Sequence, residues 1–303
     1  MPQHRSSDAP GQPPLTHRAV RRFAATGLLA AALFMLASVC QAQGASWRMA
    51  LIPYLSPNVL IPLFQPLAQH LASESGHEVD LFTAPSIRAH VERITRAEYD
   101  IVFTAPHFGR LAQLEAGYVP IGSFERPLVG VLTVRRGGPI ASVADLRGKA
   151  IAINDRLVLN SIVTLQELAR QGIGLEEIRI VPAASQNSAL LSVANGDVDA
   201  AITVNFALGQ VPAERQKDLQ VLFQTPETPG VPSTLILVHP TMPASDRDRL
   251  EAALKRFART ETGQQFLRTS HYRDVAPVTH EGLLSLDRYL PELRRLIAVA
   301  NGS

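Results

Sequence analysis

The side chains best suited to chemistry in this sequence are hydrogen-bonding groups that follow short apolar segments. They form one candidate site, made of Tyr54, Ser56, Thr104, His107, Asn160, Ser161, Asn187 and Asn205. Hydroxyl, amide and imidazole groups both donate and accept hydrogen bonds. No paired carboxylates, which general acid–base catalysis would use, accompany them. The set therefore favours the non-covalent capture of a small polar or anionic solute.

Motifs of covalent and metal-assisted catalysis are missing from the sequence. It has no Gly-x-Ser-x-Gly elbow and no phosphate loop, and His77 with Glu78 lacks the second histidine of a zinc-binding His-Glu-x-x-His motif. The only cysteine is Cys40, so the chain after it has no thiol nucleophile and no thiolate metal ligand. We therefore expect no catalytic residue, no metal site and no cofactor, and we predict that the protein is not an enzyme.

An internal repeat indicates how the candidate residues are positioned. Residues 77–106 align without a gap with residues 176–205. The alignment pairs Ser86 with Ser185, Asp100 with Asp199, and Thr104 with Thr203. Each copy has the pattern of a strand, a helix and a second strand, which is a βαβ crossover about 30 residues long. Internal similarity of this kind indicates a duplicated structural unit.

A further strand and helix precede each copy of the repeat. We predict strands over 47–54 and 149–154, and helices over 61–75 and 159–171, where apolar residues recur at helical spacing. Parallel strands joined by βαβ crossovers need helices on both faces of their sheet. The predicted fold class is therefore α/β, with two lobes that each contain a mostly parallel sheet flanked by helices.

Two β-rich runs, 128–135 and 233–239, leave the two copies of the repeat. We predict that they cross between the lobes as a two-strand hinge, which would let the lobes close around a ligand. Further helices are predicted over 245–259, 261–268 and 281–298. The predicted division is a first lobe of residues 46–132 and 233–303 and a second lobe of residues 133–232.

Ligands of open α/β sheets bind beyond the carboxyl ends of the strands. The candidate residues lie at these ends, mostly in loops that lead into helix N-termini, whose free N–H groups and positive dipole end favour anions. Other interpretations stay open. Ser86, Ser185 and His107 suit either a ligand site or the start of a helix, and Asn187 and Asn205 also suit turns or caps.

The first 42 residues have the order of a secretory signal. Three arginines precede an apolar run over 23–39, and small residues follow, with Ala42 before the expected cleavage site. We predict a signal peptide over 1–42 and a periplasmic protein. An uncleaved membrane anchor is the alternative. A lipid anchor at Cys40 is disfavoured because Val39 fits poorly before a lipid-attachment cysteine.

The formal net charge of +2 comes from this first segment. Residues 1–42 contain four arginines and one aspartate and carry +3, so the rest of the chain carries −1. No cluster of basic residues remains in the rest of the chain, so we expect that the protein does not bind nucleic acid. We expect a monomer.

Several short motifs then resemble one known family. They are PYLSP at 53–57, PL at 66–67, YD at 99–100, TAPH at 104–107, DLRGK at 145–149 and GDVDA at 196–200. In this order they resemble the phosphate, phosphite and phosphonate-binding family of ABC-transporter periplasmic proteins, from about Trp47 to Thr260. The resemblance implies a type II periplasmic-binding fold, hinge closure and delivery of the solute to a membrane permease.

The sequence departs from the family pattern where phosphonate would bind. The resemblance leads us to expect a Ser-Thr-Ser-Gly turn at a helix N-terminus in the second lobe, but the matching stretch, 155–161, keeps only Asn160 and Ser161. A His-Glu pair of the family is Gln186-Asn187 here, which removes an acceptor for an ammonium group. The resemblance therefore implies a small oxyanion or a neutral polar solute, and disfavours an aminophosphonate. A sensor kinase is the alternative partner to the permease.

Overall fold

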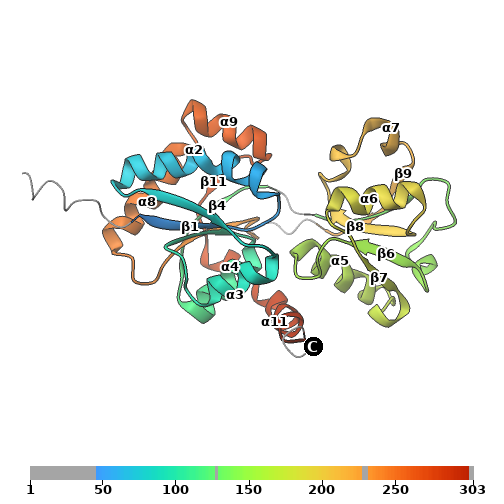
Figure 1. Cartoon of the computed structure of the whole chain (residues 1–303). Helices are drawn as coiled ribbons and strands as arrows, with labels where there is room; N and C mark the ends of the chain where they lie inside the picture. The colour runs from blue at the N-terminus through green and yellow to red at the C-terminus, as the bar shows by residue number, and fades with distance from the viewer. Residues whose placement is uncertain (1–45, 127–128, 227–230, 300–303) are drawn as a thin grey trace, which may run out of the picture. The chain divides into compact units, whose positions relative to one another are not determined.

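Two β-sheets, each flanked by helices, organise the computed structural model of the chain, which describes residues 46–126, 129–226 and 231–299 (Figure 1). The predicted signal peptide over 1–42, with Cys40, lies outside the described residues. Of the described helices, none combines the length and the apolarity needed to cross a membrane.

The first sheet has the strand order β11-β4-β10-β3-β1-β2. Its strands are β1 (Trp47–Leu51), β2 (Val79–Thr83), β3 (Ile101–Thr104), β4 (Val119–Phe124), β10 (Leu235–Val238) and β11 (Val275–Ala276). Strand β1 pairs in parallel with β2 and β3, whereas β10 pairs antiparallel with β3 and β4, and β11 antiparallel with β4. The carboxyl ends of β1, β2 and β3 therefore meet at one edge of the sheet.

The second sheet has the strand order β7-β6-β8-β5-β9. Its strands are β5 (Gly130–Arg135), β6 (Ala150–Ile153), β7 (Arg179–Pro182), β8 (Ala200–Val204) and β9 (Leu219–Gln224). Strand β6 pairs in parallel with β7 and β8, and β5 pairs antiparallel with β8 and β9. The three parallel strands at one side of each sheet are thus the part that the repeat predicts.

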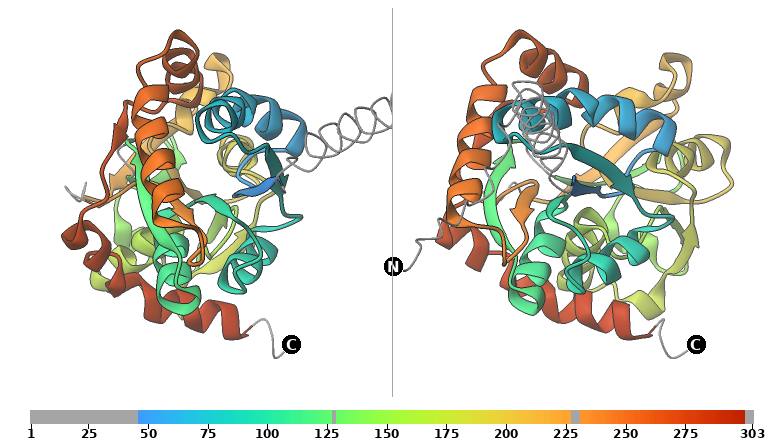
Figure 2. Two further views of the ribbon diagram at one scale, coloured as in Figure 1. Left: turned by 90° about the vertical axis from the view of Figure 1, so that its left-hand side faces the viewer. Right: turned by 60° about the vertical axis from the view of Figure 1, so that its left-hand side comes forward.

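Helices cover both faces of each sheet. In the first lobe they are α2 (Pro57–Ser75), α3 (Ile87–Thr95), α4 (Pro106–Ala116), α8 (Ala244–Phe257), α9 (Glu261–Ser270), α10 (His280–Leu284), the 3-10 turn η4 (Asp287–Tyr289) and α11 (Leu290–Val299). In the second they are η1 (Val143–Leu146), α5 (Leu159–Arg170), η2 (Leu175–Glu177), α6 (Gln186–Asn195), η3 (Leu208–Gln210) and α7 (Ala213–Gln216). Figure 2 shows α8 and α9, from the C-terminal third, packed beside α2.

The two copies of the repeat form the same structural unit. The first copy is β2-α3-β3 and the second is β7-α6-β8. In the first copy the Asp100 carboxylate accepts a hydrogen bond from the backbone N of Arg48, 2.8 Å away, at the start of β1. In the second copy the Asp199 carboxylate accepts one from the backbone N of Ala150, also 2.8 Å away, at the start of β6. Matching aspartates therefore fix the middle strand of the three parallel strands in each sheet, at the end opposite to the candidate site.

Two predicted helices differ from the structure in their bounds. Helix α2 begins at Pro57 rather than near 61, because proline is well suited to a first helical turn, where its missing N–H has no intrahelical partner. The helix predicted over 281–298 is instead divided into α10, η4 and α11. Pro291, at the second position of α11, is placed where a helix starts rather than where one continues.

The two-lobed type II periplasmic-binding fold is confirmed, and the chain crosses between the sheets twice. The first crossing follows β4 and leads into β5 at Gly130, and the second follows β9 and leads into β10. The backbone N of Gly130 donates to the Thr225 hydroxyl at 2.9 Å, and the backbone N of Phe124 donates to the Thr234 hydroxyl at 2.9 Å. The two crossing segments are therefore bonded to each other at both lobes. The lobe division at residues 132 and 232 stays a prediction.

Candidate functional site

Helix N-termini at the strand ends divide into two kinds. The helices after the edge strands β2 and β7 are capped by their own serines, because the Ser86 hydroxyl accepts from the Ala89 N–H and the Ser185 hydroxyl from the Ser188 N–H. The helices α2, α4 and α5, which follow the interior strands β1, β3 and β6, have no side-chain cap. Uncapped N–H groups are free to bind an anion. Ser86 and Ser185 are thus helix caps.

His107 brings the two lobes together at one side of the site. It is fully buried in the first turn of α4, and its Nε2 lies 2.7 Å from the carbonyl oxygen of Leu157, in the loop that leads to α5. A carbonyl only accepts, so Nε2 carries the hydrogen and Nδ1 is left as an acceptor. Nδ1 has no partner among the described residues. Leu157, Leu159 and Ile162 of the second lobe also join the core of the first.

The N-terminus of α5 carries buried polar groups that the described residues do not satisfy. The Asn160 amide nitrogen and the Ser161 hydroxyl are both buried and have no hydrogen-bond partner there. A buried polar group without a partner costs about 1–3 kcal/mol. Such groups, at the uncapped end of a helix, suit a ligand that supplies the missing bonds. This is the strongest support for Asn160 and Ser161 as site residues.

Tyr54 belongs to an aromatic cluster at the end of β1. Its side chain interacts with that of Tyr272, which follows α9, and with the positive charge of Arg126, in the first crossing segment. Burial of the hydroxyl end, followed by the effect of Tyr272, raises the pKa of Tyr54, and Arg126 opposes that rise. The phenol is therefore a neutral hydrogen-bonding group. Ser56, nearby, is exposed at the N-cap position just before α2, and its side chain makes no capping hydrogen bond.

The three other candidates lie in different surroundings. Asn187, in the first turn of α6, has a buried side-chain oxygen without a partner in the described part of the chain. Asn205 is exposed after β8, where its backbone N donates to the Val129 carbonyl. The fully buried Thr104 hydroxyl lies 2.9 Å from Nε2 of His90 in α3, inside the first lobe. Thr104 therefore already has a partner within its own lobe, and we leave it out of the proposed ligand contacts.

The two buried histidines predict a loss of stability in acid. Burial lowers the pKa of His107 to about 4 and that of His90 to about 3. The unfolded chain, with histidine pKa values near 6.5, binds more protons between those values, so acid favours unfolding. Urea unfolding should show a loss of roughly 2 kcal/mol per histidine between about pH 7 and 5. Replacing both, as His90→Gln with His107→Gln, should flatten this slope. Replacing the exposed His280 by Gln should not, and an unchanged slope in the double variant would contradict the assignment.

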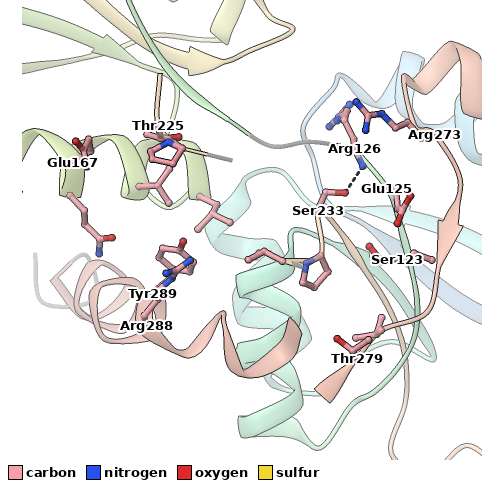
Figure 3. Close-up of a pocket in the computed structure, with 18 of the residues that line it drawn as sticks. Ser123, Glu125, Arg126, Glu167, Thr225, Ser233, Arg273, Thr279, Arg288 and Tyr289 are labelled. Atoms are coloured by element: carbon pink, nitrogen blue, oxygen red, sulfur yellow. Dashed lines mark hydrogen bonds between the residues drawn. The ribbon is translucent and has the colours of Figure 1, made fainter. Parts of the chain in front are cut away.

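A cavity of ≈ 740 Å³ lies along the crossing segments, and Arg126 is one of the residues that line it. Its walls come from α5, both crossing segments and the segment from Arg273 to Tyr289 (Figure 3). None of the eight candidate residues lines it. Figure 3 shows the backbone N of Arg126 bonded to the Ser233 hydroxyl, 2.8 Å away.

Sequence reasoning missed the cluster of Arg126, Phe206 and Tyr272, of which Arg126 and Tyr272 interact with Tyr54. Arg126 precedes the predicted hinge run at 128–135, and a cation at a hinge was a signal that could have marked it. No comparable sequence feature points to Phe206, which follows Asn205, or to Tyr272 in the C-terminal third. Only folding brings Tyr272 next to a loop more than two hundred residues before it in the chain.

Two helix-flanked sheets, joined by two crossing segments and presenting uncapped helix N-termini at their strand ends, define a two-lobed solute-binding protein. The chain belongs to the family of periplasmic substrate-binding proteins of phosphonate ABC transporters, whose family model matches residues 49–283. It is thus a periplasmic binding-protein family member, as the sequence motifs predicted. A comparison with curated protein sequences found no match.

Solved structures share the fold at low sequence identity. XAC2383 from Xanthomonas citri, bound to chloride, has a TM-score of 0.72 and 18% identity over 83% of this chain and 99% of that one. PhnD1 from Prochlorococcus marinus, in complex with methylphosphonate, has a TM-score of 0.72 and 13% identity over 82% and 98%. The aliphatic sulphonate binding protein SsuA from Escherichia coli has a TM-score of 0.57 and 17% identity over 84% and 94%. These similarities establish the shared fold.

Proposed function

We propose that this protein captures a small oxyanion at the strand ends, between its lobes, and delivers it to a membrane ABC permease. One observation carries the proposal. The helices after the interior strands β1, β3 and β6 lack side-chain caps, while those after the edge strands β2 and β7 have them. The uncapped ends, with the unpartnered Asn160 and Ser161 side chains, form a set of donors without a carboxylate.

The proposed contacts are Tyr54, Ser56, His107, Asn160, Ser161, Asn187 and Asn205. None of these side chains is a carboxylate, and the uncapped starts of α2, α4 and α5 add free N–H donors, which favours an anion over a cation. The methylphosphonate held by PhnD1 and the sulphonates that give SsuA its name are small oxyanions, and they support this choice of ligand class. A ligand bearing an ammonium group would find no carboxylate among these side chains.

The remaining features of the proposal come from the sequence. We propose that residues 1–42 export the chain, that the mature protein acts as a monomer, and that it neither converts its ligand nor binds nucleic acid. The absence of catalytic motifs and of a basic cluster in the sequence supports the last two points. Delivery to a permease is favoured over a sensor kinase because the family description names a transporter.

A thermal-shift screen of the mature protein tests the proposal. The panel contains methylphosphonate, inorganic phosphate, methanesulfonate, sulfate and acetate, with glucose and choline as the neutral and cationic controls. A ligand that binds only the folded protein adds about 2.7 kcal/mol to the free energy of unfolding at a hundredfold excess over its Kd. We expect at least one oxyanion, and neither control, to raise the Tm. No response to any anion, together with turnover of an ester substrate, would exclude an oxyanion-binding protein.

A further inference from the structure

Arg126 contacts both lobes from the first crossing segment. Its guanidinium carbon lies 4.1 Å from the ring centroid of Phe206, which follows β8 in the second lobe. It lies 4.7 Å from the ring centroid of Tyr272, which follows α9 in the first lobe. Guanidinium groups bind aromatic faces at such distances through cation–π attraction. The side chain is therefore held between one ring of each lobe.

The charge of Arg126 has no counter-ion in the described part of the chain. One terminal nitrogen, Nη1, donates to the Ser270 carbonyl at 3.2 Å, and Nε is buried without a partner there. None of the ion pairs between described residues includes Arg126. A partly buried cation without a counter-ion is costly, and an anionic ligand can remove that cost.

Arg126 also lies near Tyr54, one of the candidate residues. Its positive charge acts on the hydroxyls of both Tyr54 and Tyr272. Tyr54 follows β1, at the strand ends where the uncapped helices α2 and α4 begin. The field of the guanidinium therefore reaches the place where the proposed ligand would lie, and its planar donors match an oxyanion.

We propose that Arg126 recognises the negative charge of the ligand and couples that charge to lobe closure. The inference rests on the proposed function, because it requires an anion at the strand ends. A bound anion neutralises the cation that Phe206 and Tyr272 enclose, so it stabilises the arrangement in which both rings contact the guanidinium. A neutral solute leaves the buried charge unbalanced and does not favour closure.

Arg48 provides a matched control within the first lobe. Its guanidinium carbon lies 5.1 Å from the ring centroids of both Phe82 and Tyr99, and its Nη1 donates to the Glu98 carbonyl at 2.9 Å. Arg48→Met therefore removes the same kind of charge, ring contacts and backbone hydrogen bond as Arg126→Met. It does so at the opposite end of β1 from Tyr54.

The test is calorimetric titration of wild type, Arg126→Met, Arg126→Lys and Arg48→Met with methylphosphonate, inorganic phosphate and methanesulfonate. For each anion that binds wild type, we expect Arg126→Met to lose about tenfold to a hundredfold in affinity and Arg126→Lys to lose less. Arg48→Met should stay within about twofold. Small-angle scattering should show contraction at saturating anion for wild type and Arg48→Met, and less for Arg126→Met.

The outcomes separate the two proposals. Equal affinity of wild type and Arg126→Met overturns the role of Arg126 and leaves the oxyanion-binding function intact. If Arg48→Met loses as much affinity as Arg126→Met, the loss reflects general destabilisation, and the inference is overturned as well. Failure of wild type to bind any anion of the thermal-shift panel overturns the proposed function, and the inference with it. If Arg126→Met does not fold by circular dichroism, Arg126→Lys decides, and unchanged affinity in that variant overturns the inference.

Discussion

Replacing Ser161 by alanine should weaken ligand binding at least about tenfold and leave the ligand-free protein as stable as wild type, or more stable. The hydroxyl is fully buried at the uncapped N-terminus of α5 and has no partner among the described residues. A buried polar group without a partner costs about 1–3 kcal/mol of stability, so removing the hydroxyl from the ligand-free protein removes that cost. Removing it from the complex loses a hydrogen bond to a charged ligand, worth about 1.5–3 kcal/mol.

Thr133→Val is the control for this variant. Thr133 lies within β5, where its fully buried hydroxyl also has no partner in the described chain. Its removal should likewise preserve or raise stability, but without a change in affinity, since mid-strand positions lie away from the strand ends. Urea unfolding and calorimetric titration of both variants measure the two effects. If Ser161→Ala binds the anion as tightly as wild type, α5 is not part of the ligand site.

Replacing Gly130 by alanine should lower the free energy of unfolding on the order of 2–3 kcal/mol and weaken binding as well. Gly130 begins β5 at the end of the first crossing segment. A Cβ there would overlap the Thr164 hydroxyl and lie 3.1 Å from the Asn160 carbonyl. Both neighbours belong to α5. The added methyl group would therefore push away the helix that carries Asn160 and Ser161.

A second substitution distinguishes this mechanism from a general loss of backbone freedom. Thr164→Ala removes the atom that the new Cβ would overlap, so the Gly130→Ala, Thr164→Ala double variant should recover most of the lost stability. Gly209→Ala is the neutral control, because a Cβ at Gly209 would meet nothing within 4 Å. Urea unfolding of the four variants measures the coupling. Purely additive effects of the two substitutions would show that contact with α5 is not the cause.

Much of the fold follows from local pattern and duplication. The alignment of 77–106 with 176–205 predicted two βαβ units, and the structure has them as β2-α3-β3 and β7-α6-β8. The identities carry equivalent bonds in the two copies, through Asp100 and Asp199 at strand starts and Ser86 and Ser185 at helix caps. Such features depend on residues close to each other in the repeat, so sequence reasoning reaches them.

The candidate site was predictable in place but less so in its members. Strand ends follow from the order of elements, and this order placed His107, Asn160 and Ser161 near helix starts. For Thr104, only the structure shows that its hydroxyl lies 2.9 Å from Nε2 of His90 in the preceding helix, and its role at the site stays a prediction. The partner that a hydroxyl at a strand end meets depends on how a neighbouring helix packs. The local sequence pattern does not predict that packing.

By itself, the sequence determined the two-lobed α/β fold, the family and the strand ends as the place to look for a ligand, because periodicity and repetition are local properties. Tertiary structure alone decided which groups converge there. It placed Leu157 against His107, and it placed Arg126 between Phe206 and Tyr272. These contacts join residues far apart in the chain and from different lobes. They exist because two crossing segments hold the sheets together, so only the folded chain shows which two rings enclose Arg126.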